Sequence, residues 1–430
     1  MIGFELLENC ARTDVGIRRS HNQDAFGVSI APDESRWREH GHLFVVADGM
    51  GGHAVGEKAS AKAARDIPHL VSKYSHDGPA NALRKSYAEA NAGIHSIGQE
   101  NPEFRGLGTT ASALWLRPEG AWVAHVGDSR VYRLRDGLLE QLTFDHSAVW
   151  EIARRQGIRP DQLHGIKSNV ILRSLGPEAF VEVDIEGPHP LKPGDTFLLC
   201  SDGLSGQLSD YEIGAILASL PAAEACEFLV ELANLRGGPD NVTVLIARLS
   251  GDPEPLPASK PTRSPFEPIR KHWPLTALLV GIVLGIFALA LFALHWPGGA
   301  AAFSLAAAAV AIGLGGLLVQ SRTFASQAEQ SDEPRPLHVY ARIPCPVEPA
   351  LIDKLVLAED SVRERLPESD RGDALAEVKS QFDEAIAQRA AGKLTESFRA
   401  HCRVMHALVR RFNQLRHKEE VFSPVWDKHG

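Results

Sequence analysis

The first 250 residues predict a mixed α+β domain built in layers. Short apolar runs typical of buried strands alternate with stretches of helical periodicity, and these strands outnumber those of a simple doubly wound sheet. Beyond this domain, two charge-free apolar stretches lie within residues 273–320, and helical periodicity returns in residues 336–430. The expected fold class is therefore an α+β layered domain, followed by two transmembrane helices and a small helical C-terminal module.

Four acidic residues lie beside predicted strands, each at a corner rich in Gly or Asn. They are Asp48, Asp128, Asp202 and Asp240. The strands are expected over residues 42–47, 122–126, 196–200 and 242–247. Carboxylates at the ends of buried strands are anchored by the sheet while their oxygens face a common edge, which suits a cluster of hard divalent cations. This arrangement indicates a metal-dependent hydrolase that acts on phosphate.

Other local patterns predict the helices and one turn of the same domain. Ser209 and Glu212 form a capping-box pattern, which predicts the start of a short helix. Asp136 and Gly137 separate two apolar runs and form a dipeptide typical of a tight hairpin turn. Longer helices are expected over residues 54–74, 80–99 and 222–236.

Length, charge and cysteine usage limit the class of protein. A chain of 430 residues is too long for one ordinary domain, and 44% hydrophobic residues can form a sizeable core. A net charge of -9 gives no basic field of the kind that nucleic-acid binding requires, so no nucleic-acid partner is expected. Five scattered cysteines without a C-x-x-C pair predict neither a disulfide framework nor a zinc site, and they favour a reducing cytosol. No secretory signal is recognised at the N-terminus.

The chain changes character after residue 250. Residues 251–272 are rich in Pro and polar residues, which predicts an extended linker after the domain of residues 1–250. Residues 274–294 and 300–319 then contain no charged residue, and about 20 apolar residues is the length that spans a bilayer core. Neither stretch has the polar face of a water-exposed helix. We therefore expect a two-helix transmembrane hairpin over residues 273–320.

Basic residues around these apolar stretches predict the topology. They are Arg263, Arg270, Lys271 and Arg322, and the short turn between the two stretches has no Lys or Arg. By the positive-inside rule, both long flanks face the cytoplasm. The sequence thus predicts a two-span protein of the inner (cytoplasmic) membrane, in contact with the lipid bilayer, with its catalytic domain and C-terminus in the cytosol.

The C-terminal segment, residues 336–430, shows two apolar stripes at helical spacing. One comprises Leu375, Val378, Phe382 and Ile386, and the other Phe398, Met405, Leu408, Val409 and Phe412. With Gly392 between them, they predict an antiparallel helical hairpin, and a third helix is expected around residues 350–366. Such stripes usually pack against each other, although the outer surface of this module remains available for an unidentified protein partner.

Seven motifs extend the pattern of acidic corners. In order, they are Gly16-x-x-Arg19-x-x-Asn22-Gln23-Asp24, Asp48-Gly49-Met50-Gly51-Gly52, Gly108-Thr109-Thr110, Gly127-Asp128-Ser129-Arg130, Asp145-His146-Ser147, Ser201-Asp202-Gly203 and Asp240-Asn241-x-Thr243. As a set, in this order, they closely resemble the metal-dependent protein serine/threonine phosphatases of the protein phosphatase 2C (PPM) family in its bacterial form. The resemblance covers residues 3–249, and it implies a four-layer α/β/β/α sandwich with metals at one end.

The resemblance also implies which residues bind the metals. Asp48 would bridge two Mn²⁺ or Mg²⁺ ions, and the backbone carbonyl of Gly49 would ligate the first. Asp202 and Asp240 would hold the second ion. Asp128, together with Asp202, would form the weaker third site of bacterial members.

Further roles follow from the same resemblance, from which residue 50 departs. Arg19 would clamp the phosphate through parallel N–H donors, and Asp24 would orient metal-bound water. Met50 stands where many family members have a histidine that protonates the leaving group. His53, His146 or a metal-bound water are alternatives for this proton donor, and each histidine is more often structural than catalytic.

The function that the resemblance implies is hydrolysis of phosphoserine and phosphothreonine in proteins, through attack by a hydroxide bridging two metal ions. The expected substrates are phosphoproteins, the targets of a Ser/Thr kinase, and residues 147–180 would form a variable flap that sets their access. A catalytically silent fold of the same type is an alternative, although silent relatives would be expected to lose the ligating carboxylates. A two-metal phosphodiesterase or nuclease is disfavoured by the acidic balance of the chain.

Overall fold

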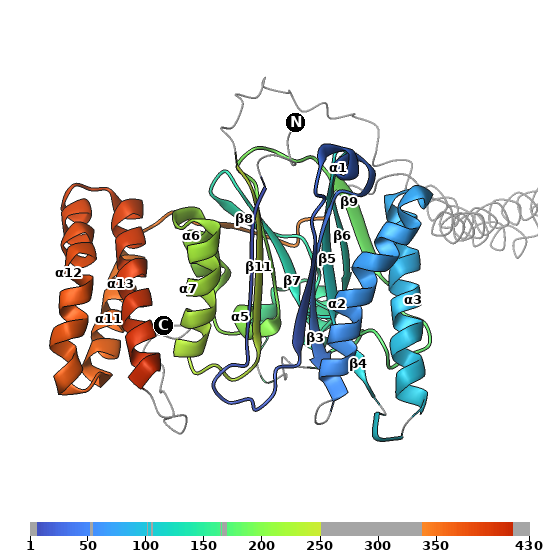
Figure 1. The fold of residues 1–430 in the computed structure, drawn as a ribbon, viewed down its shortest axis with the longest axis horizontal. Coiled ribbons are helices and arrows are strands. Elements are labelled where there is room, and N and C mark those ends of the chain that lie inside the picture. The colour runs from blue at the N-terminus through green and yellow to red at the C-terminus, as the bar shows by residue number, and fades with distance from the viewer. Residues whose placement is uncertain are drawn as a thin grey trace, which may run out of the picture. The chain divides into compact units, whose positions relative to one another are not determined.

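Two antiparallel β-sheets lie face to face and position the acidic corners (Figure 1). The first sheet has the order β1 (Leu7–Asp14), β11 (Val242–Leu249), β10 (Thr196–Cys200), β7 (Arg130–Arg135), β8 (Leu138–Gln141) and β12 (Ala341–Pro344). The second has the order β2 (Asp24–Ser29), β3 (His42–Met50), β5 (Ala111–Arg117), β6 (Gly120–Val126) and β9 (Asp184–His189), with β4 (Gly108–Thr109) paired to β3.

The structure is a computed structural model that describes residues 7–250, except 52–54, 101, 105, 164 and 166–169, together with residues 338–415. Both stretches belong to one compact unit. The predicted linker and the apolar stretches of residues 273–320 lie outside the described residues.

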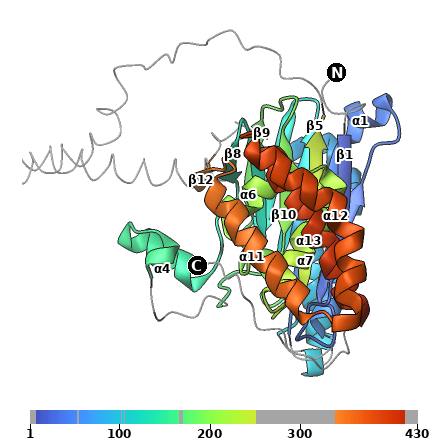
Figure 2. The same ribbon diagram turned by 90° about the vertical axis from the view of Figure 1, so that its left-hand side faces the viewer.

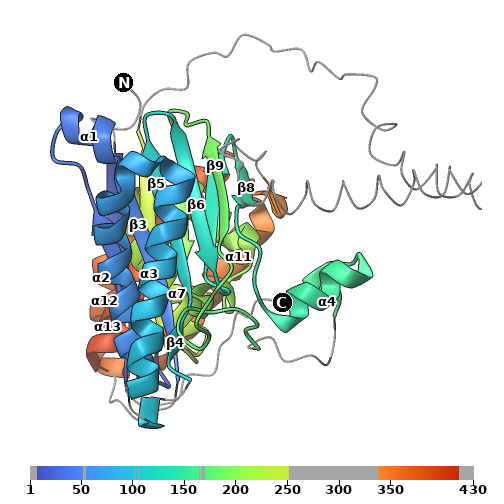
Figure 3. The ribbon, with the colours of Figure 1, turned by 90° about the vertical axis from the view of Figure 1, so that its right-hand side faces the viewer.

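Helices cover the outer faces of both sheets. Those on the second sheet are α2 (Val55–Tyr74) and α3 (Pro79–Glu100), seen from their own side in Figure 3. Those on the first sheet are α6 (Asp210–Ser219) and α7 (Ala222–Leu235). Shorter helices are α1 (Glu34–His40), α4 (Ala148–Gln156), α5 (Asp202–Ser205) and the 3₁₀ turns η1 (Ser75–Asp77), η2 (Pro102–Phe104) and η3 (Pro160–Gln162). The α/β/β/α arrangement expected for the first 250 residues is thus observed.

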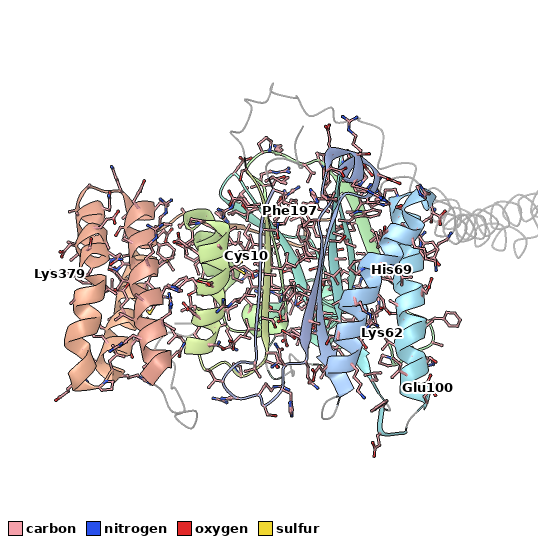
Figure 4. All side chains as sticks on the ribbon, viewed as in Figure 1. Cys10, Lys62, His69, Glu100, Phe197 and Lys379 are labelled. Atoms are coloured by element: carbon pink, nitrogen blue, oxygen red, sulfur yellow. The ribbon has the colours of Figure 1, made fainter. Side chains whose placement is uncertain are left out.

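Three apolar clusters hold these layers together. The central one lies between the sheets and includes the fully buried Phe44, Phe197 and Leu245; the label of Phe197 in Figure 4 locates it. A second cluster lies under α2 and α3, and a third lies under α6 and α7. Burying a side chain of this size stabilises the fold by about 1.5–3 kcal/mol relative to exposure. Successive side chains of a strand therefore point in turn into the central cluster and into an outer cluster. The polar residues of the acidic corners lie at the strand ends.

Local sequence signals are confirmed where they are strongest. The Ser209 side chain accepts from the Glu212 backbone N–H at 3.4 Å, and the Glu212 carboxylate accepts from the Ser209 backbone, so the capping box opens α6. Asp136 and Gly137 both have positive φ, 51° and 74°, as a two-residue hairpin turn between β7 and β8 requires. These contacts satisfy backbone groups locally, which is why short stretches of sequence suffice to predict them.

The C-terminal segment adds a further layer of helices against α6 and α7, visible face-on in Figure 2. They are α11 (Pro349–Arg365), α12 (Glu368–Ala390) and α13 (Leu394–Leu415). Their apolar residues join the cluster under α6 and α7, and the turn at Gly392 has φ 75°. Arg403 pairs with Glu224 at 2.9 Å, and His406 Nδ1 lies 2.7 Å from Glu231, so α13 is also tied to α7 by charge.

The same segment completes the first sheet, which the sequence did not predict. β12 pairs antiparallel with β8, with Ala341 opposite Gln141 and Pro344 opposite Leu138. Immediately after it, the buried Cys345 side chain rests on Gly214 of α6, where an added Cβ would lie only 2.2 Å from its sulfur. A four-residue strand ending in Pro carries little β signal of its own, so its pairing depends on the existing edge of β8.

The expectation of two transmembrane helices is corrected. Among the described residues, no helix combines the length and the apolar character needed to cross a bilayer. The long helix α2, for example, carries Lys58, Lys62, Arg65 and Asp66 within its length, and such charges are costly in hydrocarbon. The predicted fold class with two transmembrane helices, the two-span inner-membrane location and the lipid contact are therefore not supported. Residues 273–320, to which the prediction applied, lie outside the described residues.

We expect Gly214→Ala to destabilise the protein although alanine is the better helix former. The new Cβ would displace Cys345, and overpacking of this kind costs about 1–3 kcal/mol. Gly372→Ala in α12 is the matched control, because nothing lies within 4 Å of its added Cβ and it should stabilise by about 0.5–1 kcal/mol. Denaturant unfolding measures both; equal effects would contradict the close contact.

A second prediction concerns the pH dependence of stability. The hydrogen bond with Glu231 raises the pKa of His406 above 6.5, so its contribution is complete below that value and is lost as pH rises through the raised pKa. The free energy of unfolding of His406→Gln should therefore lie below that of the wild type by about 1 kcal/mol near pH 6, and the gap should close toward about pH 9. Arg403→Gln is the control, because the stability that it removes should be the same from about pH 6 to about pH 9. A stability difference between His406→Gln and the wild type that stays constant with pH would contradict the role of His406 protonation.

Candidate active site

The predicted acidic residues meet at one end of the sandwich, where strands of both sheets finish. Asp24 opens β2 and lies opposite Asp48 near the end of β3. Asp128 follows β6, Asp202 follows β10 at the start of α5, and Asp240 precedes β11. The antiparallel pairing brings the end of one strand next to the start of another, so residues far apart in sequence share this edge.

Asp48 is held rigidly by the backbone of β3 and its neighbours. Its N–H donates to Thr110 Oγ1 at 2.9 Å, and its carbonyl accepts from Thr110 N at 2.8 Å and from Thr109 Oγ1 at 2.9 Å. At Gly49, an added Cβ would lie 2.2 Å from the Gly56 carbonyl oxygen. Only glycine fits there, and this close approach fixes the path of the chain past the acidic edge.

Asp24 is linked to the first sheet through a hydroxyl. Ser201 Oγ donates to Asp24 Oδ2 at 2.7 Å and accepts from the Thr243 N–H at 2.9 Å. Asp24 is only 7% exposed, and its Oδ1 has no hydrogen-bond partner. Ser201 therefore fixes the Oδ2 atom of Asp24, whereas Oδ1 is available to a ligand.

Arg19 lies at the rim of the acidic edge and pairs with Asp240. Its Nη2 donates to Asp240 Oδ2 at 2.7 Å, and its Nε approaches the Pro239 carbonyl at 3.4 Å. Asn241 fixes the loop that carries Arg19, since its amide donates to the carbonyls of Val15 and His21 at 2.8 and 2.9 Å. The predicted phosphate clamp and a predicted metal ligand are thus direct neighbours in this structure.

Burial and mutual repulsion raise the pKa values of four site carboxyls, those of Asp24, Asp48, Asp128 and Asp202. Burial is the larger cause at each of them, and neighbouring carboxylates add to it. The pKa of Asp24 rises to about 7, that of Asp128 to about 8 and that of Asp202 to about 6, while that of Asp48 rises well above its ordinary value. Without cations, the protein thus holds these groups together at an electrostatic cost.

The donor set at this edge suits hard divalent cations. Asp24, Asp128 and Asp202 each have a buried Oδ1 without a hydrogen-bond partner, and carboxylate oxygens are the ligands that Mg²⁺ and Mn²⁺ prefer. Across the described residues, no three His, Cys, Asp or Glu side chains enclose a common point as a closed metal site. Two observations therefore indicate that this edge suits divalent cations: the donor atoms are carboxylate oxygens, and three of these oxygens have no hydrogen-bond partner.

A buried ion pair supports the loop that carries Asp128. The Arg130 guanidinium donates to Asp145 through Nε at 2.9 Å and through Nη2 at 2.8 Å, and its Nη1 donates to the Tyr132 hydroxyl at 2.8 Å. Tyr132 in turn donates to Asp210 at 2.8 Å. Gln141 Nε2 donates to Asp145 Oδ1 at 3.0 Å. Arg130, at the start of β7 and next to the Asp128 loop, is thus joined to Asp145, after the end of β8, by charge-assisted hydrogen bonds from two guanidinium nitrogens to one carboxylate.

Of the histidines considered as proton donors, His146 is engaged in structural contacts. Its Nδ1 accepts from the Gly127 N–H at 3.1 Å, which leaves the proton on Nε2, 3.1 Å from Asp184. It is 6% exposed and packs beside His125, whose pKa is lowered to about 3 by burial and by His146. His53 lies outside the described residues. The geometry therefore gives His146 a positioning role for the Gly127 backbone.

Sequence reasoning identified the acidic residues but missed their supports. Ser201, Thr110 and Asn241 belong to the sequence motifs, and each also holds a site segment through a side-chain hydrogen bond. Their positions beside the motif aspartates were the available signal. Asp184, which orients His146, is isolated in the sequence, and no local pattern marks it.

Comparisons with known proteins place these features in a family. Residues 17–235 match the protein phosphatase 2C family. The chain is 37% identical over 241 residues to the serine/threonine phosphatase stp of Listeria monocytogenes, covering 55% of this chain and 93% of that protein. The serine/threonine phosphatase structure from S. agalactiae is similar with a TM-score of 0.51 and 32% identity, covering 57% of this chain and all of that one. The catalytic domain of PstP, 35% identical and with a TM-score of 0.47 over 57% of this chain and 99% of its own, was crystallised in complex with two manganese ions.

The buried pair makes a stability prediction. Asp145→Ala leaves the Arg130 guanidinium buried without its main partner, which should cost about 3 kcal/mol or more. Asp77→Ala removes a carboxylate of similar geometry, 2.7 Å from Lys85 but exposed, and should cost less than about 0.5 kcal/mol. Chemical denaturation measures the free energy of unfolding of the two variants. Similar losses of stability in both would show that the buried Arg130–Asp145 pair stabilises the protein no more than the exposed pair.

Proposed function

Because the chain belongs to the protein phosphatase 2C family and is a metal-dependent serine/threonine phosphatase, we propose that the acidic edge of its sandwich is the site of phosphate-ester hydrolysis. The sequence predictions of enzyme class and of Mn²⁺ or Mg²⁺ as cofactor are confirmed. The observation that carries the proposed site is the set of buried carboxylate oxygens without partners on Asp24, Asp128 and Asp202.

In this proposal the ligands are divided between two ions. Asp48 would serve both ions, the Gly49 carbonyl would ligate the first, and Asp202 with Asp240 would hold the second. Asp128 contributes to a third, weaker position next to Asp202, whose charge already raises the pKa of Asp128. The raised pKa values of Asp48, Asp128 and Asp202 support cation binding here, because cations would relieve the repulsion between these carboxylates.

The bound ions would supply Lewis acidity, which makes water a stronger nucleophile near neutral pH and offsets charge on the phosphoryl group. The residues of the chain provide the positioning. Asp24, with one oxygen fixed by Ser201, keeps the other available to orient water by hydrogen bonding. Arg19 pairs with Asp240 at a half-exposed rim, so its guanidinium lies beside a proposed metal ligand, where it can donate to the oxygens of a phosphate.

We propose that the substrates are proteins phosphorylated by a Ser/Thr kinase. The described flap residues carry several exposed apolar side chains, Ile158, Val170, Leu172 and Phe180, and such a surface suits contact with a polypeptide rather than with phosphate alone. A catalytically silent role for the fold is disfavoured, because every predicted carboxylate is retained at the acidic edge. A nuclease would require a basic channel, which the net charge of -9 does not favour.

Hydrolysis of p-nitrophenyl phosphate by the full chain should require added Mn²⁺ or Mg²⁺. We expect Asp48→Asn and Asp240→Asn to lower kcat by about 10²–10⁴-fold, the size of a lost electrostatic contribution to catalysis. Asp77→Asn should leave the rate unchanged, because this exposed carboxylate lies just after the C-terminal end of α2, whereas Gly56, at the N-terminal end of α2, is the residue that approaches Gly49. Activity that persists in EDTA would exclude the mechanism.

A second readout separates metal binding from turnover. Mn²⁺ should raise the Tm of the wild type, because a ligand that binds only the folded state stabilises it. Without metal, Asp48→Asn should melt at or above the wild-type temperature, because it removes a charge from a repulsive cluster. A metal-free variant that melts well below the wild type would argue against this electrostatic cost.

A further inference from the structure

The strand that the C-terminal segment adds to the first sheet lies close to the flap of the proposed site. Tyr340, just before β12, donates from its hydroxyl to Glu186 Oε1 at 2.7 Å, and its N–H donates to the Gln141 carbonyl at 2.9 Å. The His338 N–H donates to the other Glu186 oxygen at 3.1 Å. The Tyr340 ring is thereby fixed at both ends, between β8 and β9.

The ring of Tyr340 contacts Phe144, which in turn contacts the flap helix α4. The centroids of Tyr340 and Phe144 lie 5.6 Å apart, and Phe144 meets the Trp150 ring edge-on at 5.3 Å and 88°. Trp150 also lies under the Arg130 guanidinium, at 5.5 Å. Aromatic contacts at these distances and angles stabilise a defined mutual orientation.

Helix α4 has few other contacts in the described structure: the Arg154 guanidinium lies 5.2 Å from the centroid of the Phe144 ring, and the Ala148 N–H donates to the Val170 carbonyl at 2.9 Å. It stands away from the sandwich in Figures 2 and 3, and Ala153 is its one buried residue. The aromatic contact at Trp150 lies close to its N-terminal end, where Ser147 caps the helix. Fixing Phe144 therefore fixes the base from which this part of the flap projects.

From these contacts we infer that Tyr340 is a positioning residue of the phosphatase: through Phe144 and Trp150 it holds α4 in the orientation that admits a phosphoprotein. The inference rests on the proposed site and substrate class. Tyr340 lies outside residues 17–235, the part matched to the family, so this chain supplies from its C-terminal segment a support for its own flap. Such a residue acts on the binding of a polypeptide and hardly on the chemistry of a small ester, which reaches the acidic edge without the flap.

The test compares two substrates on the full chain with Mn²⁺: a phosphothreonine peptide and p-nitrophenyl phosphate. We expect Tyr340→Ala to raise KM for the peptide about fivefold, the weight of an aromatic contact, and to leave kcat for p-nitrophenyl phosphate within about twofold of wild type. Tyr340→Phe, which keeps the ring, should restore most of the peptide KM. If Tyr340→Ala does not fold, Tyr340→Leu replaces it.

Tyr211→Ala is the matched control. Its hydroxyl donates to the Pro346 carbonyl at 2.7 Å, so it also joins the C-terminal segment to the phosphatase, but through α6 and not through Phe144. It should leave the peptide KM unchanged. Equal effects of Tyr211→Ala and Tyr340→Ala, or equal losses on both substrates, would overturn the inference.

Hydrogen exchange gives a readout that needs no turnover. Amides of α4 should exchange about fivefold faster in Tyr340→Ala than in the wild type and at the wild-type rate in Tyr211→Ala. Unchanged α4 exchange in Tyr340→Ala would refute the positioning role. A wild-type chain inactive on both substrates would instead refute the proposed function, and the exchange experiment would still decide the role of Tyr340.

Discussion

The fold depends on the cost of gathering negative charge in a buried place. Four carboxyls at the acidic edge have raised pKa values because water is excluded from them and because they repel one another. Two sheets with apolar faces on both sides supply the free energy that keeps these groups close, and hydrogen bonds from Thr110 and Ser201 fix their directions. A protein optimised for stability alone would not keep this arrangement, which is expected at a functional site.

How much the sequence predicts follows from the range of each interaction. The strand ends at Asp48 and Asp202, the capping box at Ser209 and the hairpin at Asp136 were predictable, because contiguous residues produce them. The convergence of the aspartates was expected from their positions beside the strands, whereas their separate roles were predictable only through the resemblance of the whole motif set. The pairing of Arg19 with Asp240 was not, because two segments over two hundred residues apart create it.

The C-terminal segment illustrates the other limit. Its helices α11, α12 and α13 were expected from their apolar stripes, but nothing in the sequence indicates what those stripes face. In the structure they share a cluster with α6 and α7, and Ile386, assigned to a stripe, is 53% exposed. The expected membrane helices were inferred from hydrophobicity alone, and the helices that the structure describes give them no support. Periodicity specifies which face of a helix is apolar; the partner of that face is a tertiary property.

Strand β12 has a further consequence for how the protein is made. β8 is synthesised first and lies at the edge of its sheet until β12 arrives, about ninety residues after the end of β11, or on the order of 5–20 s at ordinary rates of translation. During that interval the ribosome-bound chain exposes an unpaired strand edge, the kind of surface that other chains and chaperones recognise. A nascent chain halted before Ala341 would therefore keep β8 as its edge strand, whereas in the finished protein the short strand β12 covers β8.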